Sequence, residues 1–306
     1  MNVLSLFDGM SCGQIALERA GIKVDNYFAS EIKPHAIKVT QHNYPKTIQL
    51  GDVTKITKEI LPHIDMVIGG SPCQDFSRGN KERAGLDGTK SGLFMEYLRI
   101  KKEVNPSFFL LENVIMDFLD RKTIDDYMEC LPIRINSSLV SAQLRDRLYW
   151  TNIGPFDKTM FGIHECLIPP PTDKGIKLAE VIYNGFTDMH KSRALLESDS
   201  RPLATPVKMF HRYFATGFTT CIFKDQKTFN EMEQAYTQGN IDHGVFTKEN
   251  IRYFNQEELE KLQTVPQGYT SILKRNDAAC LLGDGWTVDV IAHIFSFLPQ
   301  EYKIPL

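Results

Sequence analysis

The sequence predicts an α/β fold, in which a mostly parallel sheet is covered by helices on both faces, together with a smaller irregular lobe. Two observations predict it. Short apolar runs alternate with helical patterns up to about residue 153, and such alternation is typical of parallel sheets. The alternation is then lost and returns only near the end of the chain. With 306 residues, the chain is long enough for one large domain and a smaller companion.

The predicted strands are fully apolar runs with turn residues on either side. They lie at 2–7, 25–30, 65–70, 107–114 and 146–153. The helical patterns that follow are at 13–21, 34–43, 93–104 and 123–131. Ligands of open parallel sheets bind outside the carboxyl ends of the strands. The residues that follow each strand are therefore the candidates for a site.

The second lobe begins where the regular alternation stops. Residues 155–250 carry proline clusters, mixed turns and short β-like runs such as 217–223. A helical pattern returns at 255–265, and an apolar helix is expected at 287–298, packed back against the sheet. We expect a larger domain made of residues 1–160 and 270–306, and a smaller region at 161–269.

Composition sets the class of protein. The hydrophobic share of 42% and charged share of 24% are typical of a soluble globular protein, and no apolar run is long enough to span a bilayer. No secretion signal opens the sequence. The cysteines are scattered, which indicates a reducing cytosol and neither a metal site nor a disulfide framework; they are Cys12, Cys73, Cys130, Cys166, Cys221 and Cys280.

Three predicted strand ends or turns carry residues suited to a nucleoside. The first strand ends in FDGMSCG, where Gly9 and Gly13 allow a sharp turn close to a ligand before a helix begins. Glu31 follows the second strand, where a carboxylate can accept hydrogen bonds from ribose, and Asp52 lies in a later turn. Each alone is equally consistent with a tight turn or a solvated carboxylate. Taken together, the three positions favour a site for a nucleoside cofactor.

The third and fourth strands end in residues with a different chemistry. GGSPCQDFS (69–77) puts Cys73 directly after a proline at a strand end, and ENV begins with Glu112 at the end of the next strand. QLRDR (143–147) leads two arginines into the fifth strand. A thiol, a carboxyl and a guanidinium that converge beside a nucleoside site suit nucleophilic catalysis. The alternative is a buried free cysteine, a capping glutamate and a surface arginine pair.

These ordered motifs resemble those of the cytosine-5 DNA methyltransferases. The matching motifs are FDG…G, GGSPCQDFS, ENV, QLRDR and, near the C-terminus, LLGDGWTVDVIAHIFSFL (281–298). The resemblance covers about residues 1–153 and 251–298. VLSLFDG, VIGGSPC and the tryptophan are closest to the eukaryotic de novo branch, whereas PCQDFS is nearer the bacterial form. GDGW (283–286) departs from the many bacterial members that have Asn after the first Gly, which leaves the packing role of that position open.

The resemblance implies a class I S-adenosylmethionine-dependent methyltransferase fold, which is Rossmann-like. In this fold, residues 1–160 and 270–306 would form the catalytic and cofactor-binding domain, and 161–269 the target-recognition region. The resemblance also implies a catalytic set of five residues. Cys73 would attack C6 of a flipped cytosine, and Glu112 would bind its N3/N4 edge. Arg147 would bind O2 with support from Arg145, while Pro72 stiffens the turn. S-adenosylmethionine would be the cofactor, held by Phe7, Asp8, Gly9, Gly13, Glu31, Ile32, Asp52, Val53, Trp286 and Val288.

DNA contacts are expected in two segments. The polar segment 78–92 contains four Arg/Lys and four Gly residues and is interpreted as a loop that closes over DNA, with an ordinary solvated loop as the alternative. Between 201 and 227, five Lys/Arg residues and one Asp alternate with aromatics, which fits either a groove-facing surface or a solvated β-ribbon. The candidate contacts are Ser77, Arg78, Lys81, Arg83, Lys208 and Arg212.

Three other functions compete with this one. A tRNA cytosine-5 methyltransferase shares the chemistry, and an inactive regulatory homologue shares the fold. A nicotinamide-dependent oxidoreductase requires GxGxxG where this chain has FDGMSCG. The expected partner is duplex DNA, with no membrane and no metal. The expected state is a monomer, with an oligomer as the alternative, in the cytoplasm of a bacterium or a phage-infected cell.

Overall fold

The computed structural model describes residues 1–71, 91–158, 163–196, 205–217 and 219–304. The chain divides into two compact units. Unit 1 comprises Met1–Asn136, Asp146–Pro171 and Val288–Leu306, and unit 2 comprises Ser137–Arg145 and Thr172–Thr287. The expected functional division, 1–160 with 270–306 against 161–269, stays a prediction.

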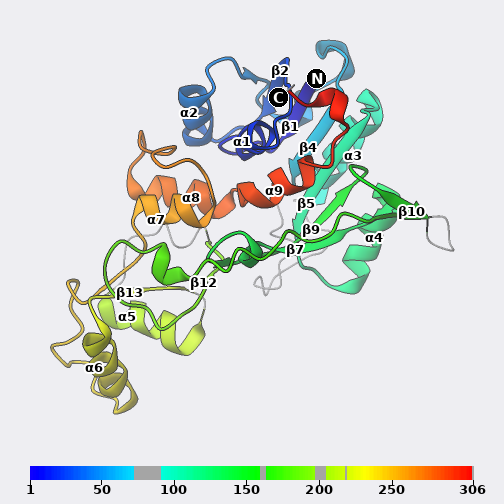
Figure 1. Ribbon diagram of the computed structural model, residues 1–306. Coiled ribbons are helices and arrows are strands. Elements are labelled where there is room, and N and C mark those ends of the chain that lie inside the picture. Colours follow the sequence, from blue (N-terminus) through cyan, green and yellow to red (C-terminus); the bar gives the residue numbers. More distant parts are fainter. Residues whose placement is uncertain (72–90, 159–162, 197–204, 218, 305–306) are drawn as a thin grey trace. The chain divides into compact units, whose positions relative to one another are not determined.

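Unit 1 is built on a seven-stranded sheet with the order β3-β2-β1-β4-β5-β9-β7. All neighbouring pairs from β3 to β5 are parallel, whereas β9 runs antiparallel to both β5 and β7. The mostly parallel α/β sheet predicted from the sequence is therefore confirmed (Figure 1). The strands are β1 (Asn2–Leu6), β2 (Asn26–Ser30), β3 (Ile48–Gln49), β4 (Met66–Gly70), β5 (Phe108–Val114), β7 (Ile133–Asn136) and β9 (Asp146–Thr151).

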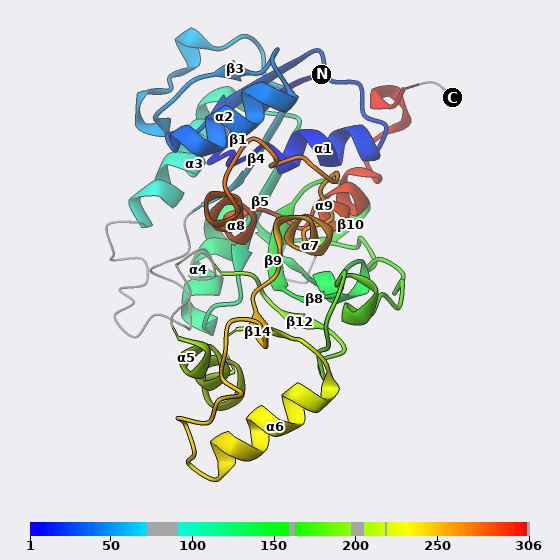
Figure 2. The ribbon, with the colours of Figure 1, turned by 90° about the vertical axis from the view of Figure 1, so that its left-hand side faces the viewer.

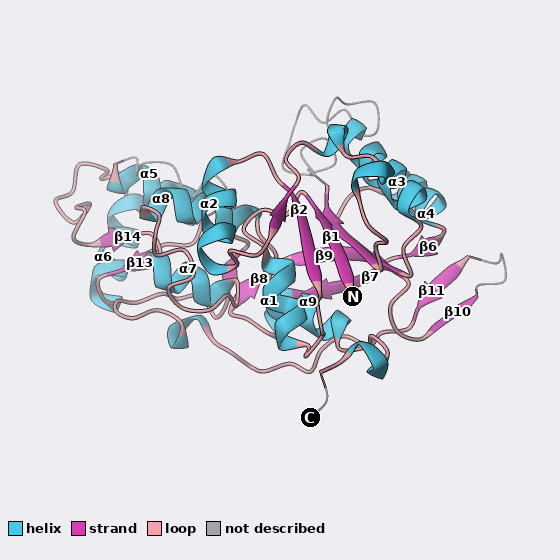
Figure 3. Ribbon diagram, turned by 90° about the horizontal axis from the view of Figure 1, so that it is seen from above, coloured by secondary structure: helices cyan, strands magenta, loops and turns pink. Residues whose placement is uncertain are grey.

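Helices cover both faces of this sheet. Figure 3 shows α3 and α4 on one side of the strands and α1 and α9 on the other. On the α3/α4 face, Phe94 and Tyr97 are fully buried in one cluster with Leu4, Leu6 and Trp150 of the strands. The helices of unit 1 are α1 (Cys12–Arg19), α2 (Pro34–Asn43), α3 (Ser91–Val104), α4 (Phe118–Met128) and α9 (Val288–Phe295). A small second sheet contains β6 (Cys130–Leu131), β10 (Phe156–Lys158) and β11 (His164–Cys166).

The helix predicted at 123–131 is wrong at both ends. It begins at Phe118 because the Asp117 carboxylate accepts a hydrogen bond from Asp120 N at 3.1 Å and caps the helix. It ends at Met128 because Glu129 adopts a left-handed conformation with φ 58°. The chain is then free to form β7, which the sequence did not predict.

Unit 2 contains more helix than the predicted β-like runs allowed (Figure 2). An aromatic core holds it together, with Phe210, Tyr213, Phe223 and Phe229 among its buried members. Its strands are β8 (Gln143–Leu144), β12 (Ser192–Arg193), β13 (Ile222–Phe223) and β14 (Ile251–Arg252). Its helices are α5 (Pro206–His211), α6 (Gln226–Thr237), α7 (Gln256–Leu262) and α8 (Arg275–Asp284).

Arg275–Phe295 is the one stretch of the described chain with the length and hydropathy of a membrane-spanning helix. It comprises α8 and α9, separated at Gly285–Thr287. Of its most apolar window, 61% is buried inside the protein, which is typical of core helices.

Replacement of Gly69 by Ala is expected to destabilise unit 1 by about 1–3 kcal/mol. A Cβ atom at Gly69 would lie 2.9 Å from the Leu6 carbonyl oxygen and 3.2 Å from the Tyr97 ring. Gly92→Ala is the matched control, because a Cβ there meets nothing within 4 Å and alanine favours helix. Denaturant unfolding of both variants measures the difference, and equal stabilities would contradict the tight packing at Gly69.

Candidate active site

The turn between β1 and α1 has an unusual backbone. Phe7, Gly9 and Ser11 adopt left-handed conformations with φ of 57°, 60° and 61°. Only glycine takes this conformation without strain, so the other two residues each cost about 1 kcal/mol or more. Backbone hydrogen bonds offset this strain: Asp8 N donates to Ser30 O at 3.0 Å, and Ser11 N donates to Asp8 O at 3.1 Å. The turn is thereby tied to the end of β2.

Glu31, directly after β2, fixes the same turn from the other side. Its Oε2 accepts a hydrogen bond from Gly9 N at 2.8 Å, and its Oε1 accepts from Ile32 N and Lys33 N, both at 2.8 Å. A carboxylate has about four acceptor sites. The three backbone donors leave capacity for a further donor, such as a ribose hydroxyl.

Asp52 and Ile32 extend the surface that a nucleoside would need. Asp52 follows β3 and caps the short helical turn Val53–Lys55, where its Oδ1 accepts from Thr54 N at 3.0 Å. Hydrogen bonds from Thr54 hold the pKa of Asp52 below its usual value. The Ile32 side chain is 71% exposed and offers an apolar surface, whereas Val53 is buried and can act only by packing beneath it. The carboxylates and the apolar side chain fit the ribose and the base of a nucleoside.

The carboxyl group of Asp8 lies in a polar environment that the sequence did not indicate. Tyr27 Oη donates to Asp8 Oδ1 at 2.8 Å, and Ser11 Oγ donates to Asp8 Oδ2. Burial raises the pKa of Asp8 to about 6 against the opposing effect of these hydrogen bonds. Ser11 and Tyr27 were missed as site residues. Ser11 stands inside the FDGMSCG motif, but Tyr27 occupies an ordinary position of an apolar strand.

The second part of the candidate site lies where β5 meets β9. Arg147 Nε is 2.9 Å from Glu112 Oε1, and the two side chains are only 15% and 12% exposed. In the antiparallel register, Glu112 is opposite Tyr149 and Val114 is opposite Arg147, so the pair is diagonal on one face. A shielded ion pair of this kind fixes the orientation of a carboxylate much more firmly than an exposed one.

The end of β4 lies beside Glu112. Gly70 pairs with Glu112 in the parallel register, and Asn113 Nδ2 donates to Ser71 Oγ at 3.2 Å. The chain therefore leaves β4 next to the carboxylate and continues to the predicted nucleophile. Six predicted residues lie outside the described part of the chain: Pro72, Cys73, Ser77, Arg78, Lys81 and Arg83.

Three further predicted residues have positions that limit what they can contribute. Arg145 belongs to unit 2, where its guanidinium donates to Leu195 O at 3.2 Å and to Gly285 O at 2.9 Å. Trp286 also belongs to unit 2 and is half-buried. Val288 is fully buried at the start of α9, so its side chain supports packing. Their roles at a ligand stay predictions.

The basic and aromatic segment of unit 2 is organised differently from a stacking surface. Phe210, Tyr213 and Phe223 are buried in the core of the unit, so they are unavailable to nucleic-acid bases. Lys208 is exposed on α5, and Arg212 is half-buried, 3.5 Å from the hydroxyl of Tyr253. The two cations remain candidate phosphate contacts.

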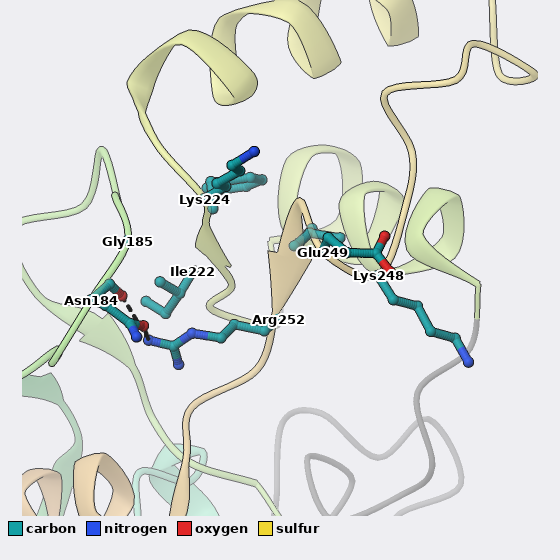
Figure 4. A pocket seen from close by; sticks show the side chains of 9 residues that line it. Asn184, Gly185, Ile222, Lys224, Lys248, Glu249 and Arg252 are labelled. Atoms are coloured by element: carbon teal, nitrogen blue, oxygen red, sulfur yellow. Dashed lines mark hydrogen bonds between the residues drawn. The ribbon is translucent and has the colours of Figure 1, made fainter.

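A cavity of about 390 Å³ lies in unit 2 between β13, β14 and the Asn184–Gly185 segment. Figure 4 shows Arg252 extending toward Asn184, whereas Lys248 extends away from it. Arg252 donates to Asn184 Oδ1 at 2.9 Å and to Glu258 Oε1 at 2.9 Å. Glu258 pairs with the guanidinium, so the remaining positive charge of the lining comes from Lys224 and Lys248 and is offset in part by Glu249.

Residues 1–129 match the family described as C-5 cytosine-specific DNA methylase. Over 282 residues, the chain is 29% identical to the type II methyltransferase M1.ScrFI of Lactococcus lactis subsp. cremoris, a match covering 87% of this chain and 70% of that protein. Both matches support the cytosine-5 DNA methyltransferase family for this chain. The resemblance stated from the motifs is confirmed.

Other relatives of this methyltransferase family match a shorter segment. The orphan methyltransferase M.SPRI of Bacillus phage SPR is 40% identical over 116 residues, which cover 37% of this chain. The match spans about a quarter of that protein, 26%, and 23% of the orphan methyltransferase M.Rho11sI of Bacillus phage rho11s.

Solved structures support the class I methyltransferase fold. The Entamoeba histolytica methyltransferase EhMeth superposes with a TM-score of 0.71 at 16% identity and covers 99% of both chains. The Spodoptera frugiperda DNMT2 mutant gives 0.66 at 19% identity, covering 95% of this chain and 97% of that one. At these identities the likeness concerns the fold alone.

Replacement of Glu31 by Gln is expected to destabilise unit 1 by about 1.5–3 kcal/mol. Glutamine has one acceptor oxygen in place of two, so at least one of the Gly9, Ile32 and Lys33 backbone donors loses its partner. Thermal unfolding without ligand measures the loss. Glu165→Gln on β11 is the control, because Glu165 is exposed and makes no side-chain hydrogen bond within the described residues. An unchanged melting temperature for Glu31→Gln would refute the anchoring role.

Proposed function

We propose that this chain is a DNA cytosine-5 methyltransferase that acts on a cytosine flipped out of duplex DNA. The observation that carries the proposal is the shielded Arg147–Glu112 ion pair beside the end of β4, from which the chain continues to Pro72 and Cys73. The family match, residues 1–129, includes β4, Cys73 and Glu112. A carboxyl group and a thiol that act together suit attack on a pyrimidine ring.

S-adenosylmethionine would supply an electrophilic methyl group when bound. The residues beyond β1, β2 and β3 fit its parts: the Phe7–Gly13 turn suits the methionine portion, Glu31 the ribose and Asp52 with Ile32 the adenine. Val53, Trp286 and Val288 complete the proposed set. The turn needs no rearrangement to present Gly9 and Gly13, because Glu31 already holds it.

Cys73 would open the reaction by adding its thiolate to C6 of cytosine, which moves an electron pair to C5. Glu112 would take up a proton from water when the base enters the site and give it to N3 as this charge develops, and Arg147 would keep the carboxyl aligned while binding O2. C5 then takes the methyl group. A water molecule removes the C5 proton, Cys73 leaves as thiolate, and the N3 proton returns to Glu112. Arg145 and Pro72 are proposed as supporting residues.

Binding to DNA would come from residues on both sides of the flipped base. Extrusion of a base costs a few kcal/mol, and phosphate contacts offset this cost without reading sequence. The proposed contacts are Ser77, Arg78, Lys81, Arg83, Lys208 and Arg212. We further propose that the chain acts as a monomer in the cytoplasm of a bacterium or of a phage-infected cell.

Transfer of a tritiated methyl group from S-adenosylmethionine to DNA tests the proposal. Cys73→Ala is expected to lower the rate by at least about a thousandfold, since the covalent step is lost. Cys280→Ala, at a half-buried cysteine of α8, is the matched control and should keep its activity. Methylation of tRNA but not DNA would favour the tRNA alternative, and no transfer to either would favour the inactive homologue.

DNA that contains 5-fluorocytosine provides the covalent readout. Since fluorine replaces the C5 proton, elimination of Cys73 is blocked and the protein–DNA adduct should survive denaturing electrophoresis. The Cys73→Ala variant should give no adduct, and an adduct of equal yield with that variant would rule out Cys73 as the nucleophile.

Glu112→Gln is expected to lower kcat by about 10²–10⁴-fold while leaving DNA affinity within a few fold. The amide keeps the shape of the side chain but cannot give N3 a proton, and it removes the ionic partner of Arg147. Single-turnover methylation measures the chemical step, and fluorescence anisotropy measures DNA binding. Retention of the wild-type rate would exclude Glu112 as the proton donor.

A further inference from the structure

A chain of hydrogen bonds lies beneath the β1–α1 turn and ends on Asp8. Tyr27 Oη donates to one carboxylate oxygen at 2.8 Å, and Ser11 Oγ donates to the other. Thr40 Oγ1 is 3.1 Å from Ser11 Oγ, and Gln14 Nε2 is 3.2 Å from it. Tyr27, Ser11 and Thr40 are all buried, with exposed fractions of 4%, 0% and 0%. This series of hydrogen bonds is therefore shielded from exchange with water.

The number of available protons fixes the direction of each hydrogen bond in this series. The Ser11 hydroxyl has one proton and two acceptor sites. Its proton goes to Asp8, so its two acceptor sites serve Thr40 and Gln14. Gln14 uses its second N–H on Thr47 Oγ1 at 2.7 Å. The hydroxyls of Tyr27 and Ser11 thus donate to the Asp8 carboxylate, and Thr40 and one N–H of Gln14 donate to Ser11, an arrangement that suits an ionised carboxylate.

Protonation of Asp8 adds a donor to a group whose hydrogen-bond partners are themselves donors. The neighbours of its oxygens, Tyr27, Ser11 and Ser5, are already donors, so a protonated carboxyl would force one hydroxyl to turn away. Burial raises the pKa of Asp8 to about 6, with a smaller upward contribution from the negative charge of Glu31, while the hydrogen bonds from Ser11, Ser5 and Tyr27 oppose the rise. Asp8 therefore changes charge at mildly acidic pH.

We propose that Tyr27 and Ser11 are positioning residues that keep Asp8 ionised and the Phe7–Gly13 turn in its binding conformation, so that cofactor affinity is lost in mild acid. This inference rests on the proposed function, because the methionine portion of S-adenosylmethionine carries a cationic ammonium group that an ionised Asp8 favours. Neither hydroxyl needs to touch the cofactor. Each acts through Asp8.

The pH dependence follows from the sign of the pKa shift. The binding-competent form is the ionised one, so the affinity is nearly complete at pH 7, is halved at about pH 6 and falls further as pH drops below that value. Below it, the affinity is expected to fall about tenfold for each pH unit, with release of nearly one proton on binding. Removal of a hydroxyl that stabilises the carboxylate raises the pKa of Asp8 and moves this transition to higher pH.

Isothermal titration calorimetry of the full chain with S-adenosylhomocysteine, without DNA, tests the inference between pH 5.0 and 7.5. Two buffers of different ionisation enthalpy give the number of protons released. Tyr27→Phe should shift the midpoint upward by about one pH unit, which makes binding about fivefold weaker at pH 6, with recovery toward the wild-type affinity at pH 7.5. A role confined to stability would weaken binding at every pH alike.

Tyr44→Phe is the matched control, because the Tyr44 hydroxyl donates to Glu18 at 2.8 Å and takes no part in the hydrogen bonds that lead to Asp8. Its midpoint should equal that of the wild type. Ser11→Ala removes the other donor and replaces Tyr27→Phe if the latter fails to fold. A flat wild-type profile, or unshifted midpoints in both variants, overturns this inference alone. Failure of the wild type to bind at any pH overturns the proposed cofactor and the inference with it.

Discussion

The three backbone hydrogen bonds to the Glu31 carboxylate are the constraint on which the cofactor side of the site depends. The hydrogen bond from Gly9 joins the ends of the adjacent parallel strands β1 and β2, and those from Ile32 and Lys33 hold the carboxylate in place. The left-handed residues Phe7 and Ser11 are costly by themselves and persist because the surroundings over-determine them. A turn held in this way is preorganised, so little conformational entropy remains to be lost when a ligand binds.

The catalytic side depends instead on the direction of β9. In a wholly parallel sheet, the residues beside the end of β5 would all come from strand ends. Because β9 runs antiparallel, its first residues lie beside the last residues of β5, and Arg147 reaches Glu112 from the strand rather than from a loop. A side chain on a strand is held more firmly than one on a loop, which suits a group that must keep a carboxylate aligned.

The sequence predicted what depends on local pattern. Buried strands appear as apolar runs, and strand ends reveal their polar residues, so Glu31, Glu112 and Arg147 could be named in advance. The features that the sequence did not predict depend on tertiary contacts. The start of α4 depends on a cap by Asp117. Of the aromatics near Lys208, Phe210 is buried in the core whereas Phe214 is 45% exposed, a difference that only the packing decides. Tyr27 could not be found, because only folding brings its hydroxyl to Asp8.

Charge is sorted along the chain in a way that its net value of −3 conceals. Asp8, Glu31 and Asp52 follow β1, β2 and β3, and carboxylates at such positions favour a cationic ligand over a phosphate-bearing one. The segment 201–227 instead has five Lys/Arg against one Asp, which favours a polyanion. A cofactor that carries positive charge and a nucleic acid that carries negative charge thus find opposite potentials on different segments. A dinucleotide would bring its two phosphates to the β1–α1 turn beside Asp8, where an ionised carboxylate repels them, which argues against the oxidoreductase alternative, whereas Glu31 would suit the ribose of either cofactor.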